Sequence, residues 1–164
     1  MARSLIGGLI ADGFNPQNIA VSDPSSACLS ALLDIYPISA YSDNIEAIQH
    51  SQAVILAVKP QQLQSVAKAL AGHFPSNTLF ISIAAGIRID DISRWLDQDP
   101  VAIVRAMPNT PALVQAGATA LYANDAVSNA QSELAESILR AVGVALWVKD
   151  ENKIDAVTAL SGSG

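Results

Sequence analysis

The stretch Ala53-Val54-Ile55-Leu56-Ala57-Val58-Lys59-Pro60 decides how this chain is expected to fold. Its first six residues are apolar without a break, which is typical of a strand that is covered on both faces of a parallel sheet. Pro60 suits the first position of a helix, and the helix predicted from it reaches Ala71. A buried strand followed directly by a helix is the repeating unit of α/β proteins.

The same alternation is predicted on both sides of this stretch. Upstream, we expect a helix over 2–11, a strand over 18–21, a helix from Pro24 to Leu33 capped by Ser22 or Asp23, and a helix over 44–50. Downstream, we expect strands over 78–83, 101–106 and 144–148, helices over 89–96, 128–142 and 150–160, and an extended segment over 117–123. Gly7 and Gly8 lie inside the first helix, where they predict close packing against a sheet or another backbone.

These elements predict an α/β fold with a doubly wound, mostly parallel Rossmann-type sheet that is incomplete at the N-terminus. The sequence starts directly on a helix, with no strand and no G-x-G-x-x-G turn before it. Either the sequence is a fragment or the true start lies upstream. In such sheets ligands bind beyond the carboxyl ends of the strands, so the residues that follow each strand are the candidates for a site.

Composition excludes several functional classes. The chain has 164 residues, of which 51% are hydrophobic and 15% charged, with a formal net charge of −6. The hydrophobic fraction is too high for a disordered protein, and the negative charge disfavours binding to duplex DNA or to an anionic membrane surface. The single cysteine, Cys28, lies among apolar neighbours and is expected to be buried. No apolar run reaches a spanning length and no signal peptide is evident, so a cytoplasmic location is predicted.

Several segments together resemble pyrroline-5-carboxylate reductase. They are 57–60 (Ala-Val-Lys-Pro), 82–87 (Ser-Ile-Ala-Ala-Gly-Ile), 105–111 (Arg-Ala-Met-Pro-Asn-Thr-Pro), 117–119 (Gly-Ala-Thr) and 159–164 (Ala-Leu-Ser-Gly-Ser-Gly), with Met1-Ala2 opening the first helix. The resemblance implies a dinucleotide-binding domain over 1–149, without the family's first strand and glycine-rich turn, and the start of a helical C-terminal domain over 150–164. It also implies reduction of 1-pyrroline-5-carboxylate to L-proline by NADP(H), with NAD(H) possible, in a homo-oligomer.

The resemblance assigns roles to individual residues. The implied cofactor-binding residues are Met1, Ser22, Asp23, Asn44, Ala57, Val58, Lys59, Pro60, Ala84, Ala85, Gly86 and Asn109. The implied substrate-binding residues are Met107, Pro108, Asn109, Thr110, Ser161, Gly162, Ser163 and Gly164. No residue is assigned to proton transfer. Once the imine nitrogen is protonated, the imine carbon accepts a hydride without a strong protein acid.

Each assignment has a purely structural alternative. Ser22 and Asp23 suit a helix cap, Lys59 a solvated strand end, and Ala84-Ala85-Gly86 a tight connection between strand and helix. The segment 107–111 also suits an Asx turn, and 161–164 a frayed tail. Arg105 is expected to pair with an acid and so hold the adjacent loop.

Two alternatives to this function remain open. One is a hydroxyacid or prephenate dehydrogenase, which needs a proton-transferring Lys or His. The other is an inactive fragment that is not an enzyme. His50 and His73 are expected on the surface, without the spacing of metal ligands. Trp95 and Trp147 are expected in the core or in an interface.

Overall fold

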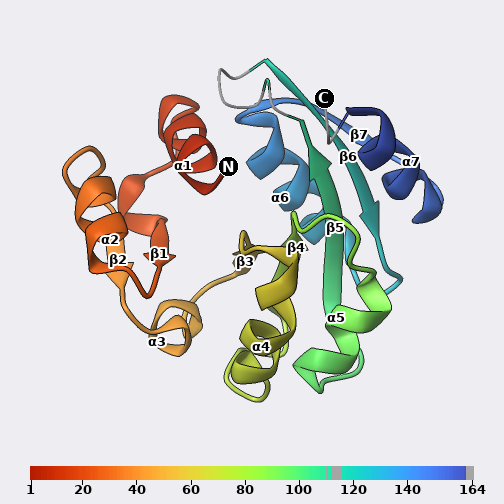
Figure 1. Cartoon of the computed structure of the whole chain (residues 1–164), viewed down its shortest axis with the longest axis horizontal. Helices are drawn as coiled ribbons and strands as arrows, with labels where there is room; N and C mark the ends of the chain where they lie inside the picture. Colours follow the sequence, from red (N-terminus) through yellow and green to blue (C-terminus); the bar gives the residue numbers. More distant parts are fainter. Residues whose placement is uncertain (110, 112–115, 162–164) are drawn as a thin grey trace.

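Two separate β-sheets organise the chain in a computed structural model, which describes residues 1–109, 111 and 116–161 (Figure 1). The smaller sheet pairs β1 with β2, and the larger has the order β3-β4-β5-β6-β7. The strands are β1 (Ala20–Ser22), β2 (Ser39–Tyr41), β3 (Ala53–Leu56), β4 (Leu79–Ser82), β5 (Ala102–Pro108), β6 (Gly117–Ala123) and β7 (Gly143–Trp147). The helices are α1 (Ala2–Ala11), η1 (Pro16–Asn18), α2 (Ser26–Leu33), α3 (Asn44–Ile48), α4 (Pro60–Leu70), α5 (Ile89–Leu96), α6 (Asn129–Arg140) and α7 (Asn152–Ser161).

The larger sheet is mostly parallel, as predicted. Strands β3, β4 and β5 are parallel neighbours, β6 is antiparallel to β5, and β7 is parallel to β6. Strand β1 is parallel to β2 in the smaller sheet. The predicted α/β architecture is therefore confirmed.

Two of the apolar clusters in the core share strand β4. Leu79 and Ile81 belong to the cluster that includes residues of α1 and α6, whereas Phe80 belongs to the cluster that includes residues of α4 and α5. This division follows from the pleat, which sends successive side chains of a strand to opposite faces. All four residues of β4 are buried, so helices cover both faces of this strand.

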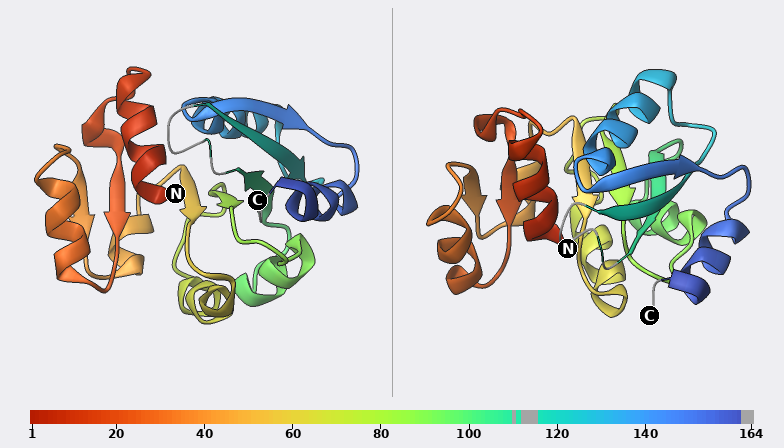
Figure 2. Two further views of the ribbon diagram at one scale, coloured as in Figure 1. Left: turned by 45° about the horizontal axis from the view of Figure 1, so that its top comes forward. Right: turned by 90° about the horizontal axis from the view of Figure 1, so that it is seen from above.

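Helix α1 lies between the two sheets (Figure 2). A Cβ atom on Gly8 would collide with the backbone carbonyl oxygen of Ala141, next to the end of α6, and would lie 3.0 Å from Val142 Cγ1. A Cβ atom on Gly7 would lie 2.7 Å from the Tyr36 hydroxyl, which belongs to the segment between α2 and β2. The close packing predicted at this glycine pair is confirmed.

Several sequence-based expectations about the first 60 residues are wrong. Helix α2 begins at Ser26 and is capped by Ser25, whose Oγ accepts from Cys28 N. Asp23 instead accepts a hydrogen bond from Ser25 N at 2.8 Å, so it closes a local turn before the helix. Cys28 is exposed, because α2 buries none of its residues.

Strands β2 and β3 also differ from expectation. Strand β2, which has three residues and pairs with β1, was not predicted from the sequence. Strand β3 ends at Leu56 and is only partly buried over its first three residues. Among the described residues it pairs with β4 alone, which leaves its other edge open.

None of the helices in the described ranges is both long enough and apolar enough to cross a lipid bilayer.

Candidate functional site

The carboxyl ends of β3, β4 and β5 lie at one edge of the larger sheet. The pairing register places Leu56 beside Ser82 and Ser82 beside Arg105. The predicted site segments 57–60 and 84–86 therefore leave the sheet beside the part of β5 that continues into the segment 107–109, although the three lie far apart in sequence. Such an edge is where ligands bind in open α/β sheets.

Packing below this edge links the three segments. Val58 contacts the buried cluster that contains Ala84, and Ala85 contacts the cluster formed by Met107, Ala120 and Ile154. The first predicted segment is the most open of the three, because Ala57 and Lys59 are exposed. Pro60 is the first residue of α4, as predicted. Within the described residues Lys59 forms no ion pair, so the structure gives it no fixed partner.

Gly86 has the backbone conformation that its proposed role requires. Its φ angle is +74°, in the left-handed region that residues with side chains rarely adopt. A Cβ atom built on Gly86 would meet nothing within 4 Å. The turn after β4 therefore presents bare backbone to open space at the carboxyl edge.

The segment that follows Arg105 is partly strand, not wholly the expected loop. Met107 and Pro108 belong to β5, pair with Ala120 and Thr119 of β6, and are buried. Asn109 follows the strand, and its Oδ1 accepts a hydrogen bond from Ala118 N at 2.9 Å. This bond ties the end of β5 to the start of β6 and leaves the Asn109 amide nitrogen as a donor. Thr110 lies outside the described residues.

Ser22 and Asn44 meet at the end of β1. The Ser22 hydroxyl donates to Asn44 Oδ1 at 2.7 Å, which joins the last residue of β1 to the first residue of α3. The structure thus brings together two of the residues predicted at the far end of a cofactor site. Met1 is exposed and is the N-cap residue of α1.

Arg105 is a fully buried residue of β5, with 1% of its side chain exposed. It pairs with Glu151 and Asp155, so the expectation that it pairs with an acid is confirmed. Local sequence did not predict these two carboxylates or Arg88, which also pairs with both of them. Their spacing of four residues at the start of a predicted helix was the available signal, because it places both on one helix face.

Helix α7 carries the chain from these carboxylates to Ser161, where it ends. Gly162, Ser163 and Gly164 lie outside the described residues.

His50 and His73 are exposed, as expected, and no group of three metal-binding side chains occurs in the described ranges. Trp95 packs against the α4–α5 cluster, but Trp147 is 38% exposed and donates to Glu136 through Nε1.

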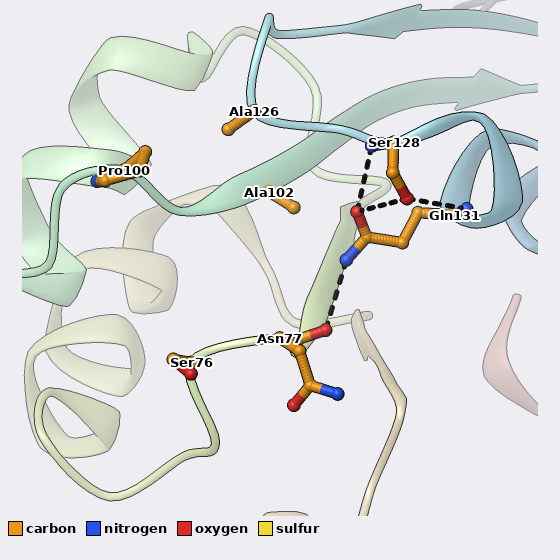
Figure 3. Close-up of a pocket in the computed structure, with 7 residues that line it drawn as sticks. All are labelled: Ser76, Asn77, Pro100, Ala102, Ala126, Ser128 and Gln131. Atoms are coloured by element: carbon orange, nitrogen blue, oxygen red, sulfur yellow. Dashed lines mark hydrogen bonds between the residues drawn. The ribbon is translucent and has the colours of Figure 1, made fainter.

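A hollow of about 400 Å³ lies at the opposite edge of the sheet, near the amino ends of β4 and β5 (Figure 3). Two of its polar side chains already bond within the protein. Ser128 and Gln131 form a reciprocal cap at the start of α6, and Gln131 Nε2 donates to the Asn77 carbonyl at 3.1 Å. The hollow lies away from the predicted site segments, none of which lines it.

Known proteins resemble this chain over its whole length. A family described as NADP oxidoreductase coenzyme F420-dependent matches residues 1–86. The pyrroline-5-carboxylate reductase of Pseudomonas aeruginosa is 48% identical over 164 residues, covering 100% of this chain and 60% of the relative. That of Synechocystis is 42% identical over 165 residues, again covering 100% of this chain and 60% of the relative.

Solved structures agree with these matches. The structure of a pyrroline-5-carboxylate reductase from Coxiella burnetii has a TM-score of 0.94 at 42% identity, covering 99% of this chain and 60% of that one. The Plasmodium falciparum pyrroline carboxylate reductase with NADP bound has a TM-score of 0.84 at 26% identity, covering 98% and 58%. A prephenate dehydrogenase from Aquifex aeolicus has a TM-score of 0.77 at 16% identity, covering 96% of this chain and 59% of that one, and shares the fold alone.

The resemblance predicted from the sequence motifs is confirmed by these matches. The chain spans about 60% of the length of the curated relatives it matches.

Proposed function

This chain belongs to the family described as NADP oxidoreductase coenzyme F420-dependent, and on that premise we propose that it is the dinucleotide-binding part of a pyrroline-5-carboxylate reductase. The reaction is the reduction of 1-pyrroline-5-carboxylate to L-proline by NADPH, with NADH as an alternative donor. The names of the relatives from Pseudomonas aeruginosa and Synechocystis support this assignment.

One structural observation carries the proposal: the turn after β4 is bare backbone beside two other predicted site segments. Gly86 has a positive φ, and the place of its missing Cβ is open. A flat nicotinamide ring needs such an approach to the backbone. The residues present therefore fit a dinucleotide.

In this proposal the cofactor lies along the carboxyl edges of both sheets. Ser22, Asp23 and Asn44 bind the adenosine end, and 57–60 bind the nicotinamide ribose through backbone groups. Ala84, Ala85 and Gly86 contact the nicotinamide. Asn109 donates its free amide N–H groups at the boundary between nicotinamide and substrate.

The substrate is proposed to lie between the end of β5 and the end of α7. Met107, Pro108, Asn109 and Thr110 form one wall, and 161–164 supply hydroxyl and backbone N–H groups for the substrate carboxylate. When bound, the reduced nicotinamide supplies the hydride. The protein positions the imine against the nicotinamide. It needs no strong acid, because the carbon is already electrophilic when the imine nitrogen is protonated.

The domain division is part of the same proposal. Residues 1–149 form the dinucleotide-binding domain and 150–164 begin a helical one. The open edges of β1 and β3 support a place for a further parallel strand between the two sheets, since each of these strands is paired on one side only. In the left view of Figure 2 the arrows of β1, β2 and β3 point the same way, as a shared parallel sheet requires.

We further propose a cytoplasmic homo-oligomer whose ligands are small molecules. The net charge of −6 disfavours nucleic acid and anionic lipid as partners.

The direct test is an assay of the complete natural polypeptide that carries this sequence. We expect oxidation of NADPH that depends on added 1-pyrroline-5-carboxylate, with proline as the product. If neither NADPH nor NADH is oxidised in the presence of the imine, the proposed function is wrong.

A pair of variants tests the cofactor site. Gly86→Val is expected to weaken cofactor binding at least tenfold, because it forces a β-branched residue into a positive φ and fills the nicotinamide space. Lys59→Ala is the matched control at the neighbouring strand end, and an exposed charge there contributes about 0–1 kcal/mol. The measurement is the dissociation constant of NADPH by fluorescence titration, after both variants are shown to fold. If Lys59→Ala binds normally but loses turnover by orders of magnitude, Lys59 transfers a proton and the dehydrogenase alternative gains support.

A further inference from the structure

Four charged side chains form one network between the end of the sheet and the start of α7. Glu151 Oε1 accepts from Arg105 Nη1 at 3.1 Å, and Asp155 Oδ1 accepts from Arg105 Nη2 at 2.5 Å. Arg88 completes the network, with Nη2 at 3.1 Å from Glu151 Oε2 and Nη1 at 3.7 Å from Asp155 Oδ2. Two guanidinium groups therefore balance two carboxylates.

Arg105 depends on this network more than any other member. Its side chain is 1% exposed, whereas the side chains of Arg88 and Asp155 are 44% and 46% exposed. Its Nε has no hydrogen-bond partner among the described residues. A buried cation of this kind is costly without its counter-ions. Glu151, which precedes α7, and Asp155 within it therefore fix where Arg105 and α7 lie relative to each other.

Glu151 also caps a second helix. Its Oε1 accepts from Ile89 N at 2.9 Å, and Ile89 is the first residue of α5. Arg88, the N-cap residue of α5, provides no side-chain cap of its own. One carboxylate therefore holds together the segment after Gly86, strand β5 and the start of α7.

The network places α7 directly over two predicted site segments. Ile154, one residue before Asp155, is 1% exposed and packs with Met107 and Ala120. Ala85 and Val157 contact the same small cluster. A shift of α7 would thus change the packing of Met107 and Ala85 and would move Ser161, where the helix ends.

We propose that Arg105 is a positioning residue for the substrate: through Glu151 and Asp155 it holds α7 so that the end of this helix and the end of β5 form one binding site for the substrate carboxylate. This inference rests on the proposed function. Arg105 itself acts through α7 and does not touch the reacting atoms. The two nitrogens of its planar fork bind two carboxylates at once, which the single ammonium of a lysine cannot reproduce with the same geometry.

The experiment compares steady-state kinetics and cofactor binding in the complete natural polypeptide. For Arg105→Met we expect the KM for the imine to rise at least tenfold, while kcat and the dissociation constant of NADPH stay within threefold. For Asp155→Asn we expect a smaller rise in KM, since Glu151 still holds Arg105. Arg105→Lys is expected to restore only part of the affinity that Arg105→Met loses.

A control variant shows whether removing an arginine charge outside this network changes the kinetics. Arg94→Met breaks the exposed pair of Arg94 with Asp91, whose distance is 3.0 Å and which lies within α5. This variant is expected to keep the wild-type KM and kcat. If Arg105→Met does not fold, the milder Asp155→Asn variant decides the question.

The outcomes separate this inference from the proposed function. If the wild-type enzyme reduces the imine but KM is unchanged in Asp155→Asn and in folded Arg105→Met, the inference is overturned alone. It is also overturned if kcat and cofactor affinity change as much as KM, because the network then supports the fold in general. If the wild-type enzyme reduces no imine, the proposed function fails and this inference fails with it.

Discussion

The two sheets of this protein are buried to very different degrees. In the five-stranded sheet every residue of β4 and β5 is buried, and apolar clusters lie on both faces. In the two-stranded sheet no residue of β1 or β2 is buried, and helix α2 beside it buries none of its residues. Leu33 and Ile35, at the end of this helix, are 47% and 49% exposed.

This difference in burial indicates which region provides most of the stability of the fold. Burial of apolar area is the main favourable term in folding, so the larger sheet and the helices that pack on it provide most of it. The smaller sheet depends on its contacts with α2 and α3 and, in our proposal, on a further strand between β1 and β3. Substitutions in the two regions should therefore have unequal effects.

The largest expected effect is in β4. Phe80 is fully buried and its ring lies 4.7 Å from that of Phe74, edge to face. Phe80→Ala is expected to lower the free energy of unfolding by about 3–5 kcal/mol. Leu33→Ala in α2 is the matched control and should lower it by less than about 1 kcal/mol, because little apolar area is lost. Urea denaturation of both variants measures this, and equal losses would contradict the comparison.

The second effect concerns the two sides of α1. Gly8→Ala places a methyl group against the Ala141 carbonyl, which is backbone and cannot move aside. We expect it to lower the free energy of unfolding by about 1–3 kcal/mol. Gly7→Ala meets only the Tyr36 hydroxyl, at the end of a movable side chain.

The Gly7→Ala variant therefore serves as the control. Its helix-propensity gain of about 1 kcal/mol should offset the small displacement of Tyr36. Thermal unfolding of the two variants side by side measures the difference. A greater loss in Gly7→Ala would mean that α1 packs more rigidly on the smaller sheet than on α6.

The smallest effect is expected at Cys28. Because this side chain is exposed in the two-stranded region, Cys28→Ser should change the free energy of unfolding by no more than about 0.5 kcal/mol. The native protein should also react with a thiol reagent as fast as the urea-unfolded protein. Slow labelling in the native state would show that α2 is covered there.

Local sequence by itself determined those helices and strands whose own residues carry a clear hydrophobic pattern. Helix α5 and strand β6 lie at the predicted positions 89–96 and 117–123. Strand β4 was recognisable as well, since an uninterrupted apolar run bounded by turn residues needs no knowledge of its neighbours. The motif segments were likewise found in sequence, and their place after strands predicted a common edge.

Tertiary structure alone decided the features that depend on residues far away in sequence. Strand β2 is three residues long and exists through pairing with β1, and β5 continues through Met107 and Pro108 because β6 pairs with them. Cys28 has apolar neighbours in sequence, but its side chain is exposed in the folded chain. The partners of Arg105 lie 46 and 50 positions further along the chain. Local patterns report which side chains prefer burial, whereas pairing and charge balance depend on which segments the folded chain brings together.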